Sequence, residues 1–433
     1  MKYRSTRSPR PQISLSAALA QGLAPDGGLY VPVEWPHWSQ DALLADALVP
    51  IATTMMRPFA AGDVLETSLE TICGAAFNFP CPLTTVTADG ALSVLELFHG
   101  PTAAFKDFGA RFLAASLATL RRPTDPPLTI LVATSGDTGG AVAAAFHRRP
   151  GFNVVVLFPQ GRVSPAQQLQ LTCWGDNVLG VAVRGDFDDC QALVKAAFRD
   201  SDLALRLHLS SANSINLGRL LPQMAYYAWA SVHHWRQFET KLSFIVPSGN
   251  LGNAMACVWA RQIGLPIADI IIAQNANRSV VDFLDTGEWR PRPTIATLAS
   301  AMDSGNPSNM ERLLDLTPSA SDMRKALSAC TVSDEQIRQR IRHDFAEYGR
   351  IWCPHTATAA EVYAQLEPPR RKRPWAIVST AHPAKFPEIV EPLIDSTIKL
   401  PPALAALADR ATHYEVMSPE IESLRAILGS LAG

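Results

Sequence analysis

Short apolar segments rich in β-branched residues alternate with helix-like segments from residue 92 to about residue 280, and this alternation constrains the fold most. The predicted strands are 92–98, 128–134, 152–159, 177–183 and 242–248, with a further buried strand beginning at Trp375. The predicted helices are 108–122, 139–149, 190–200, 218–235 and 253–264. Alternating strands and helices of these lengths are typical of βαβ units, in which helices cover both faces of a parallel sheet. The pattern predicts an α/β fold with open, mostly parallel sheets.

A chain of 433 residues is too long for a single hydrophobic core, so we expect more than one domain. We predict an N-terminal segment at 1–92, a smaller α/β domain at 93–236 and a larger α/β domain at 237–433. Apolar residues make up 47% of the chain, and the net charge is -2. This balance gives no general attraction to nucleic acid or to an anionic membrane, so any bound phosphate must be held by a local site.

The seven cysteines are scattered, without a CxxC pair or the spacing of metal ligands, and they indicate reduced, mostly buried thiols. The first residues lack the apolar core of a secretory signal, and no uncharged apolar run is long enough to span a membrane. We expect a cytoplasmic protein that binds no metal.

Ligands of open α/β sheets lie beyond the carboxyl ends of the strands, and four segments place polar residues there. In the first, residues 96–112, Lys106 lies near the start of an apolar helix. A helix N-terminus and an apolar setting both disfavour an ammonium ion, which lowers the pKa of a lysine as a Schiff-base amine requires. The alternative is an exposed lysine beside Asp107.

The second and third segments each join a buried strand to a helix through a loop of small residues. Residues 134–140 read TSGDTGG, in which backbone amides and the hydroxyls of Ser135 and Thr138 favour a carboxylate. Asp137 disfavours a phosphate dianion there, and it is alternatively a simple helix cap. The third loop lacks an acid and offers donors for a phosphate from Ser248, Gly249, Asn250, Leu251, Gly252 and Asn253.

The fourth segment, 375–386, places Thr380 just beyond a buried strand. Lys385 follows as a second candidate for the Schiff-base lysine, although its turn after a proline indicates an exposed position. Residues 210–223 lie between the other segments and offer Asn213, Ser214 and Arg219 for a second phosphate. The alternative for this stretch is a capped helix with an exposed arginine.

These segments together resemble the long bacterial and fungal type of threonine synthase. The resemblance runs in order along nearly the whole chain. It rests on YRSTR, QGLAPDGGLYVP, LELFHGPTAAFKDFGARF, TSGDTGGA, SANSIN, VPSGNLGN, CPHTATA and STAHPAKF. It implies the pyridoxal-phosphate fold type II, which includes the tryptophan synthase β chain.

The resemblance also implies roles for the candidate residues. Lys106 would carry pyridoxal 5'-phosphate as a Schiff base and act as general base. Asp137 would lie near the phenolic oxygen of the cofactor, residues 248–253 around its phosphate, and Thr380 near its pyridine nitrogen. The substrate would be O-phospho-L-homoserine, which loses phosphate from its γ-carbon and gains water at its β-carbon to give threonine. Its carboxylate would bind Ser135, Gly136 and Thr138, and its phosphate would bind Asn213, Ser214 and Arg219.

Other readings stay open at this point. Another member of the same fold, such as a threonine dehydratase or a cysteine synthase, needs no second phosphate site. Residues 210–223 therefore distinguish a threonine synthase from these enzymes. A catalytically silent relative would bind a ligand without turnover. A nicotinamide-dependent dehydrogenase is disfavoured because no GxGxxG follows any strand. The resemblance suggests a monomer or a weak homo-oligomer.

Overall fold

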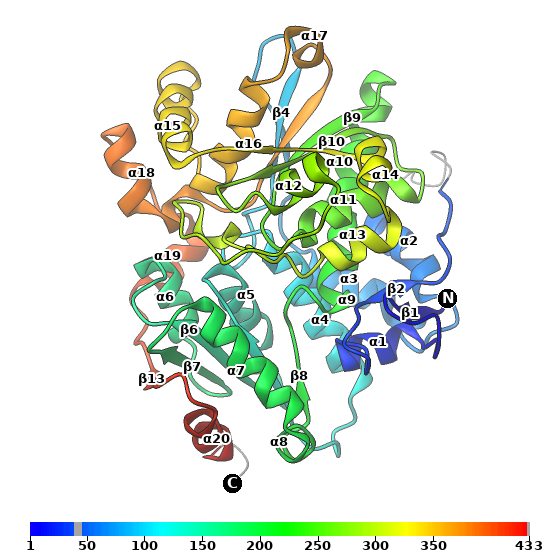
Figure 1. The fold of residues 1–433 in the computed structure, drawn as a ribbon, viewed down its shortest axis with the longest axis vertical. Coiled ribbons are helices and arrows are strands. Elements are labelled where there is room, and N and C mark those ends of the chain that lie inside the picture. The colour runs from blue at the N-terminus through cyan, green and yellow to red at the C-terminus, as the bar shows by residue number, and fades with distance from the viewer. Residues whose placement is uncertain (39–45, 431–433) are drawn as a thin grey trace.

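The computed structural model describes residues 1–38 and 46–430, and it contains two main sheets (Figure 1). The upper sheet in Figure 1 has six strands in the order β11-β10-β9-β12-β4-β3. Its strands are β3 (Leu83–Thr85), β4 (Leu92–Glu96), β9 (Leu242–Pro247), β10 (Ile267–Gln274), β11 (Ser328–Thr331) and β12 (Trp375–Ser379). All neighbouring pairs are parallel except β3 and β4. The sheet therefore directs the ends of β4, β9 and β12 to one edge.

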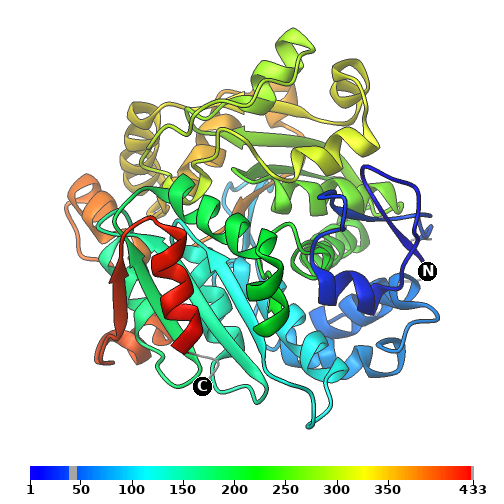
Figure 2. The same ribbon diagram turned by 60° about the horizontal axis from the view of Figure 1, so that its bottom comes forward.

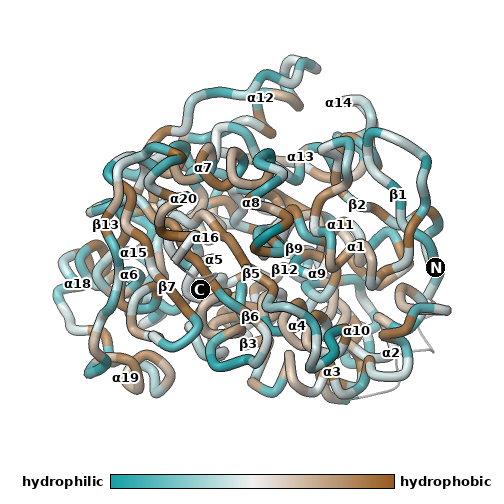
Figure 3. Tube along the Cα trace, turned by 90° about the horizontal axis from the view of Figure 1, so that it is seen from below, coloured by the Kyte–Doolittle hydropathy of each residue, from teal (hydrophilic) through white to brown (hydrophobic). Residues whose placement is uncertain are grey.

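The lower sheet is entirely parallel and has the order β13-β7-β6-β5-β8. Its strands are β5 (Leu128–Ala133), β6 (Phe152–Pro159), β7 (Val178–Val183), β8 (Leu209–Ser210) and β13 (Tyr414–Met417). The first three are nearly continuous buried apolar runs, which appear brown in Figure 3. Burial on both faces is the reason that these strands show no polar alternation.

Helices cover both sheets. In the first part of the chain they are α1 (Leu15–Gln21), α2 (Leu48–Ala60), α3 (Leu69–Ala76), α4 (Lys106–Leu120), α5 (Asp137–Phe146), α6 (Pro165–Thr172), α7 (Phe187–Arg199), α8 (Ser201–Arg206), α9 (Leu217–Leu220) and α10 (Met224–Phe238). The later ones are α11 (Gly252–Gln262), α12 (Ser279–Thr286), α13 (Met310–Leu316), α14 (Ala320–Ala326), α15 (Asp334–Tyr348), α16 (Pro354–Ala364), α17 (Pro368–Arg371), α18 (Pro387–Ile394), α19 (Pro402–Ala408) and α20 (Ile421–Ser430). None of the described helices is long and apolar enough to cross a membrane.

The N-terminal segment forms a small unit of its own. Strands β1 (Tyr3–Ser5) and β2 (Tyr30–Pro32) pair antiparallel, and α1 to α3 surround them. The Tyr3 hydroxyl donates to the Phe59 carbonyl at 2.7 Å, which fixes β1 to the end of α2. Helix α3 packs on α4 and α2 on α10, so this unit is fused to the rest of the molecule (Figure 1).

The predicted α/β class with two open, mostly parallel sheets is confirmed. The division at residues 92 and 236 stays a proposal, and the two sheets exchange strands across it. Strand β4 follows the N-terminal segment but lies in the six-stranded sheet, and β13 near the C-terminus joins β7 of the five-stranded sheet (Figure 2). Residues 39–45 and 431–433 of the predicted domains lie outside the described residues.

Two elements differ from the sequence prediction. The predicted helix at 218–235 is divided into α9, a short 3-10 turn η3 (Leu221–Gln223) and α10. Pro222 explains the division because it has no N–H to donate and its ring clashes with the preceding turn. Strand β10, a central strand, was not predicted, although its sequence is β-branched and apolar.

Candidate active site

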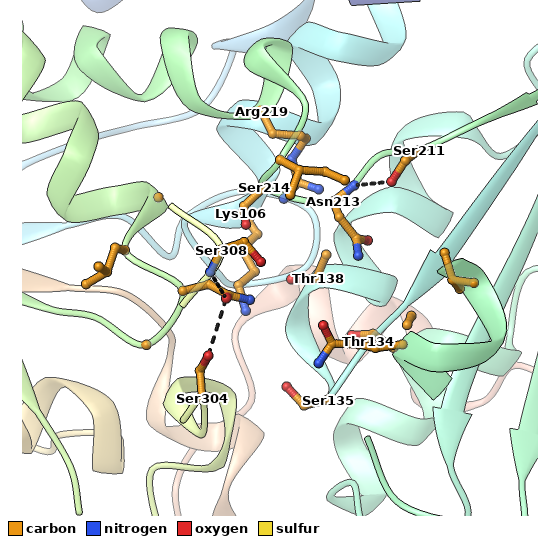
Figure 4. A pocket seen from close by; sticks show the side chains of 18 of the residues that line it. Lys106, Thr134, Ser135, Thr138, Ser211, Asn213, Ser214, Arg219, Ser304 and Ser308 are labelled. Atoms are coloured by element: carbon orange, nitrogen blue, oxygen red, sulfur yellow. Dashed lines mark hydrogen bonds between the residues drawn. The ribbon is translucent and has the colours of Figure 1, made fainter. Parts of the chain in front are cut away.

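A cavity of about 820 Å³ lies between the two sheets, at the ends of the strands that the sequence singled out. That size suits a cofactor together with a small substrate. All the predicted site residues line it except Gly136: Lys106, Ser135, Asp137, Thr138, Asn213, Ser214, Arg219, Ser248, Gly249, Asn250, Leu251, Gly252, Asn253 and Thr380. In Figure 4, Lys106 lies between the Arg219 side of the cavity and the side with Ser135.

Lys106 is the first residue of α4, and its amine has no partner. It makes no hydrogen bond or ion pair within the described residues, and it lies 5.8 Å from the ring centroid of Phe105. The pKa of Lys106 is lowered to about 8, mainly by burial; Asp137 opposes this shift, and the charges of Arg219 and Lys385 add to it. The group is therefore a lysine with an appreciable unprotonated fraction near neutral pH.

Asp137 is buried at the start of α5. Its Oδ1 accepts from Lys385 Nζ at 2.8 Å and from Gln167 Nε2 at 3.1 Å. Burial opposes the charge of this carboxyl, but Lys385 and Lys106 hold its pKa below its usual range. Asp137 is not a simple helix cap, because the cap residue is Gly136 and the Asp137 side chain makes no cap hydrogen bond.

Gly136 shapes this loop without lining the cavity. Its φ of 139° belongs to a backbone conformation that other residues rarely adopt, and a Cβ there would lie 2.3 Å from Gln167 Nε2. The Thr134 hydroxyl accepts from the N–H groups of Gly136 and Gly139, both at 2.9 Å. The loop therefore presents Ser135 and Thr138 to the cavity on a fixed backbone.

The expectation that Lys385 is exposed is wrong. Its exposed fraction is 0%, and its ammonium also donates to the Thr102 carbonyl at 2.9 Å. The sequence misleads here because the turn after Pro383 is covered by α6. The Ser164 hydroxyl, which caps α6, donates to the Lys385 carbonyl at 2.9 Å.

The loop after β9 leads into the N-terminus of α11 with its backbone close to the neighbouring segment. A Cβ on Gly249 would lie 2.3 Å from the Met302 carbonyl oxygen, so this position has no room for a side chain. Asn250 Oδ1 accepts from the Ser308 N–H at 3.1 Å. Asn253 Oδ1 accepts from two tyrosine hydroxyls, whereas its buried Nδ2 has no partner in the described residues. Backbone donors and a helix N-terminus form an anion site.

Arg219 is buried, with an exposed fraction of 2%, so the alternative of an exposed arginine is wrong. Its Nη1 donates to the Ala212 carbonyl, whereas its Nε has no partner among the described residues. Burial lowers the pKa of Arg219 to about 10, so it remains a cation at neutral pH. Asn213 Oδ1 is also buried without a described partner. Unpaired polar atoms around a cavity indicate a ligand that completes them.

Sequence reasoning missed His355, which lines the cavity from the first turn of α16. Its Nε2 accepts from the Ala301 N–H at 3.0 Å, so the proton of the neutral ring lies on Nδ1. Burial lowers the pKa of His355 to about 4, which keeps the ring neutral. Its Nδ1 is buried without a partner in the described residues, and it is therefore a neutral donor.

The segment between α12 and α13 was also missed, because its residues have no regular pattern. Asp303, Ser304 and Ser308 from this segment line the cavity. Asn275 at the end of β10 holds it in place through hydrogen bonds to Thr297 at 2.8 Å and Asp303 at 2.7 Å. Arg7 and Gln21 reach the same cavity from the N-terminal segment.

Comparison with known proteins matches three family models along the chain. A pyridoxal-phosphate-dependent enzyme model matches residues 84–380, a threonine synthase N-terminal model matches 2–77, and a threonine synthase C-terminal model matches 356–428. The threonine synthase of Serratia marcescens is 41% identical over 435 residues and is matched over 100% of both chains. The chain belongs to the threonine synthase family.

Solved threonine synthase structures have the same fold over the full chain. The crystal structure from Escherichia coli has a TM-score of 0.92 at 39% identity and covers 100% of both chains. The pyridoxal-phosphate-bound structure from Brucella melitensis has a TM-score of 0.90 at 34% identity and covers 100% of this chain and 99% of its own. The protein is thus a threonine synthase, a lyase that depends on pyridoxal phosphate and acts on a small molecule.

The cavity residues fit that cofactor. Lys106 supplies an amine with a lowered pKa, and the 248–253 loop before α11 lines the same cavity with groups that suit a phosphate. Buried atoms without described partners, including Asn253 Nδ2 and His355 Nδ1, remain to be satisfied by a polar ligand. In the described residues, no group of His, Cys, Asp or Glu side chains is arranged to hold a metal ion.

Proposed function

We propose that this threonine synthase converts O-phospho-L-homoserine and water to L-threonine and phosphate, with Lys106 as the cofactor-bearing residue. The observation that carries the proposal is that two separate groups of residues suited to bind an anion line one cavity. One is the 248–253 loop at α11, and the other is formed by Asn213, Ser214 and Arg219. A cofactor phosphate needs only one of them, so the second suits a phosphorylated substrate.

The two sites differ in the way we expect for a permanent and a transient ligand. The 248–253 loop uses backbone N–H groups and a helix N-terminus, which bind an anion without an added charge. Arg219 adds a full positive charge and an unpaired Nε, which suit a phosphate dianion that arrives and departs with each turnover. We place the substrate carboxylate at Ser135 and Thr138, which line the same cavity (Figure 4).

The remaining cofactor contacts that we propose are Asp137 near the phenolic oxygen and Thr380 near the pyridine nitrogen. Both residues are buried and line the cavity. Because Thr380 is neutral, it does not stabilise a protonated ring nitrogen as a carboxylate would. The Thr380 carbonyl accepts from the Phe105 N–H at 2.8 Å, so this residue is tied to the one that precedes Lys106.

Lys106 is the group that we expect to move protons. Pyridoxal phosphate, when bound, provides a sink for the electrons left at the substrate α-carbon. The amine of Lys106, with a pKa near 8, removes the α-proton as general base. A β-proton is removed next, and Asn213, Ser214 and Arg219 would hold the phosphate while its bond to the γ-carbon breaks. A proton then goes to the γ-carbon and water adds at the β-carbon, which gives threonine. That the enzyme is a monomer or a weak homo-oligomer in the cytoplasm stays a prediction.

The proposal is tested by phosphate release from O-phosphohomoserine, with the parent compared with Lys106→Ala. We expect the parent to be yellow and to form threonine and phosphate in equal amounts. The variant should lose both the colour and the turnover, because no other amine replaces Lys106. A yellow parent that leaves phosphohomoserine unchanged would disprove the substrate, and a parent that stays colourless with added pyridoxal phosphate would disprove the cofactor site.

The substrate-phosphate site is tested by Arg219→Gln. Loss of a charge-assisted hydrogen bond of ~2–3 kcal/mol should lower kcat/KM for phosphohomoserine about 30- to 150-fold. Cofactor affinity should change little, because the 248–253 loop is intact. Arg122→Gln is the matched control, since the Arg122 side chain is 81% exposed and, among the described residues, forms an ion pair only with Asp125. Equal turnover by the two variants would refute the role of Arg219.

A further inference from the structure

Two lysines compete for one carboxylate in the cavity wall. Lys106 and Lys385 both influence Asp137, but the structure pairs Asp137 with Lys385 at 2.8 Å and leaves Lys106 without a hydrogen bond in the described residues. Lys385 itself does not line the cavity. Asp137, which lines the cavity, is thus bound by the ammonium ion of Lys385, which does not line it.

The position of Lys385 is fixed from several directions. It ends a 3-10 turn, η5 (Pro383–Lys385), that the His382 side chain caps by accepting from the Ala384 N–H at 3.2 Å. Its ammonium donates to the Thr102 carbonyl, which also accepts from Gln170 at 3.0 Å. Thr102 lies in the turn that leads to Lys106. Lys385 therefore joins α5 to the turn before α4.

Thr102 connects this arrangement to the helix that carries Lys106. Its hydroxyl donates to Asp107 Oδ1 at 2.7 Å, and its N–H donates to Asp107 Oδ2 at 2.9 Å. Asp107 is consequently occupied by Thr102, although it follows Lys106 directly in the chain. Neither nearby carboxylate is left to bind the Lys106 amine.

We propose that Lys385 is a positioning residue, which binds the Asp137 carboxylate and so leaves the Lys106 amine free to bind the cofactor. The inference rests on the proposed role of Lys106. If Lys385 were neutral, Lys106 would be the remaining lysine close to Asp137. An ion pair between these two residues would hold Lys106 as an ammonium ion, and an ammonium ion is not a nucleophile.

The charges around Lys106 agree with this reading. Asp137 faces it from α5, Arg219 from α9, Lys385 from η5 and His355 from α16. Arg219 and Lys385 both lower the pKa of Lys106, whereas Asp137 raises it. His355 is neutral because of its burial, so it adds no charge. Removal of Lys385 therefore takes away a cation and frees an anion, and both changes favour protonation of Lys106.

The test measures how fast the full-length enzyme, freed of cofactor with hydroxylamine, regains its yellow colour with pyridoxal phosphate between pH 6 and 10. In Lys385→Met we expect the midpoint of the rate-pH profile to rise by about one to three pH units. At neutral pH this corresponds to uptake at least about tenfold slower, since the fraction of free amine falls tenfold per unit. Lys385→Arg keeps the charge, so its midpoint should stay near that of the parent.

A second variant separates this effect from a general loss of structure. In Lys385→Met with Asp137→Asn, no anion is left to trap Lys106, so the midpoint of the profile should return to the parent value or below it. The plateau rate should fall, because Asp137 is a proposed cofactor contact, so only the midpoint is compared. The double variant also lacks an unpaired buried charge, so it tests the idea even if the single variant folds poorly. An unshifted midpoint in a folded Lys385→Met, or a midpoint in the double variant that stays raised, would overturn the inference.

Failure of the underlying assignment gives a different result. Borohydride reduction of the yellow parent fixes the cofactor to its lysine, and peptide mapping identifies that residue. Label on Lys106 with an unshifted Lys385→Met profile refutes only the role of Lys385. Label on Lys385 instead refutes the assignment of Lys106 and, with it, the inference.

Discussion

Gly249 shows how a single residue can decide the shape of the cofactor site. A Cβ at this position would lie 2.3 Å from the Met302 carbonyl oxygen, and a backbone atom cannot move aside as a flexible side chain can. Gly249→Ala should therefore displace the loop at 248–253. We expect the dissociation constant of pyridoxal phosphate, measured by absorbance titration, to rise about 5- to 150-fold, because overpacking costs ~1–3 kcal/mol.

Gly74→Ala is the matched control for this change. Gly74 lies within α3, and a Cβ there would meet no atom within 4 Å. Alanine favours a helix over glycine by up to ~1 kcal/mol, so this variant should be as stable as the parent or slightly more stable, with unchanged cofactor affinity. Equal cofactor affinity in the two variants would show that the 248–253 loop does not hold the cofactor phosphate.

For single residues, the sequence predicted which side chains line the cavity better than it predicted the contacts that hold them in place. Lys106, Asp137 and Arg219 were identified because each follows a strand or begins a helix in a recognisable motif. The burial of Lys385 and the unpaired Nδ1 of His355 depend on contacts between α6, α16 and distant loops. No local pattern encodes such contacts, so they could not be predicted.

Among the elements, helix α13 links three parts of the molecule through Arg312. This side chain is 1% exposed and donates to the carbonyls of Tyr30 at 3.1 Å, Ser214 at 3.1 Å and Ile215 at 2.7 Å. Arg312→Met should leave these buried acceptors without a donor and lower the free energy of unfolding by about 3 kcal/mol or more, measured by chemical denaturation. It should also raise KM for phosphohomoserine, because Ser214 lies on the wall of the cavity.

Lys325→Met is the control for Arg312. The Lys325 side chain is 75% exposed and, within the described part of the chain, pairs only with Asp322 on α14, so its loss should change the free energy of unfolding by less than ~0.5 kcal/mol. If Arg312→Met were as stable as this control, Arg312 would not be the link that we describe between β2, the 211–216 segment and α13.

The helices and strands also show which features a sequence pattern predicts and which it does not. Strands β5, β6, β7 and β9 were placed to within one or two residues, because buried parallel strands are continuous apolar runs between turns. The irregular segment between α12 and α13 was not predicted as part of the site. Its shape comes from hydrogen bonds of Asn275 and Asn277 rather than from a periodic pattern.

For the whole molecule, the sequence predicted the class of fold and the family resemblance, but not which strand belongs to which sheet. The prediction assumed consecutive domains, whereas β4 and β12 pair with each other from positions far apart in the chain. Strand β12 also lies beside β9, so it occupies an interior place in the six-stranded sheet. Pairing between such distant strands depends on the three-dimensional packing alone.

That interior position of β12 has a consequence for synthesis on the ribosome. Strand β4 is made early, but the neighbour that covers its inner edge is not complete until Ser379 leaves the ribosome. At ~5–20 residues per second, β4 and β9 wait for roughly 15–60 s and 7–30 s, respectively, with an unpaired edge. A nascent chain in this state is prone to aggregation. The order of translation therefore leaves one edge of each of these strands uncovered until residue 379 has emerged.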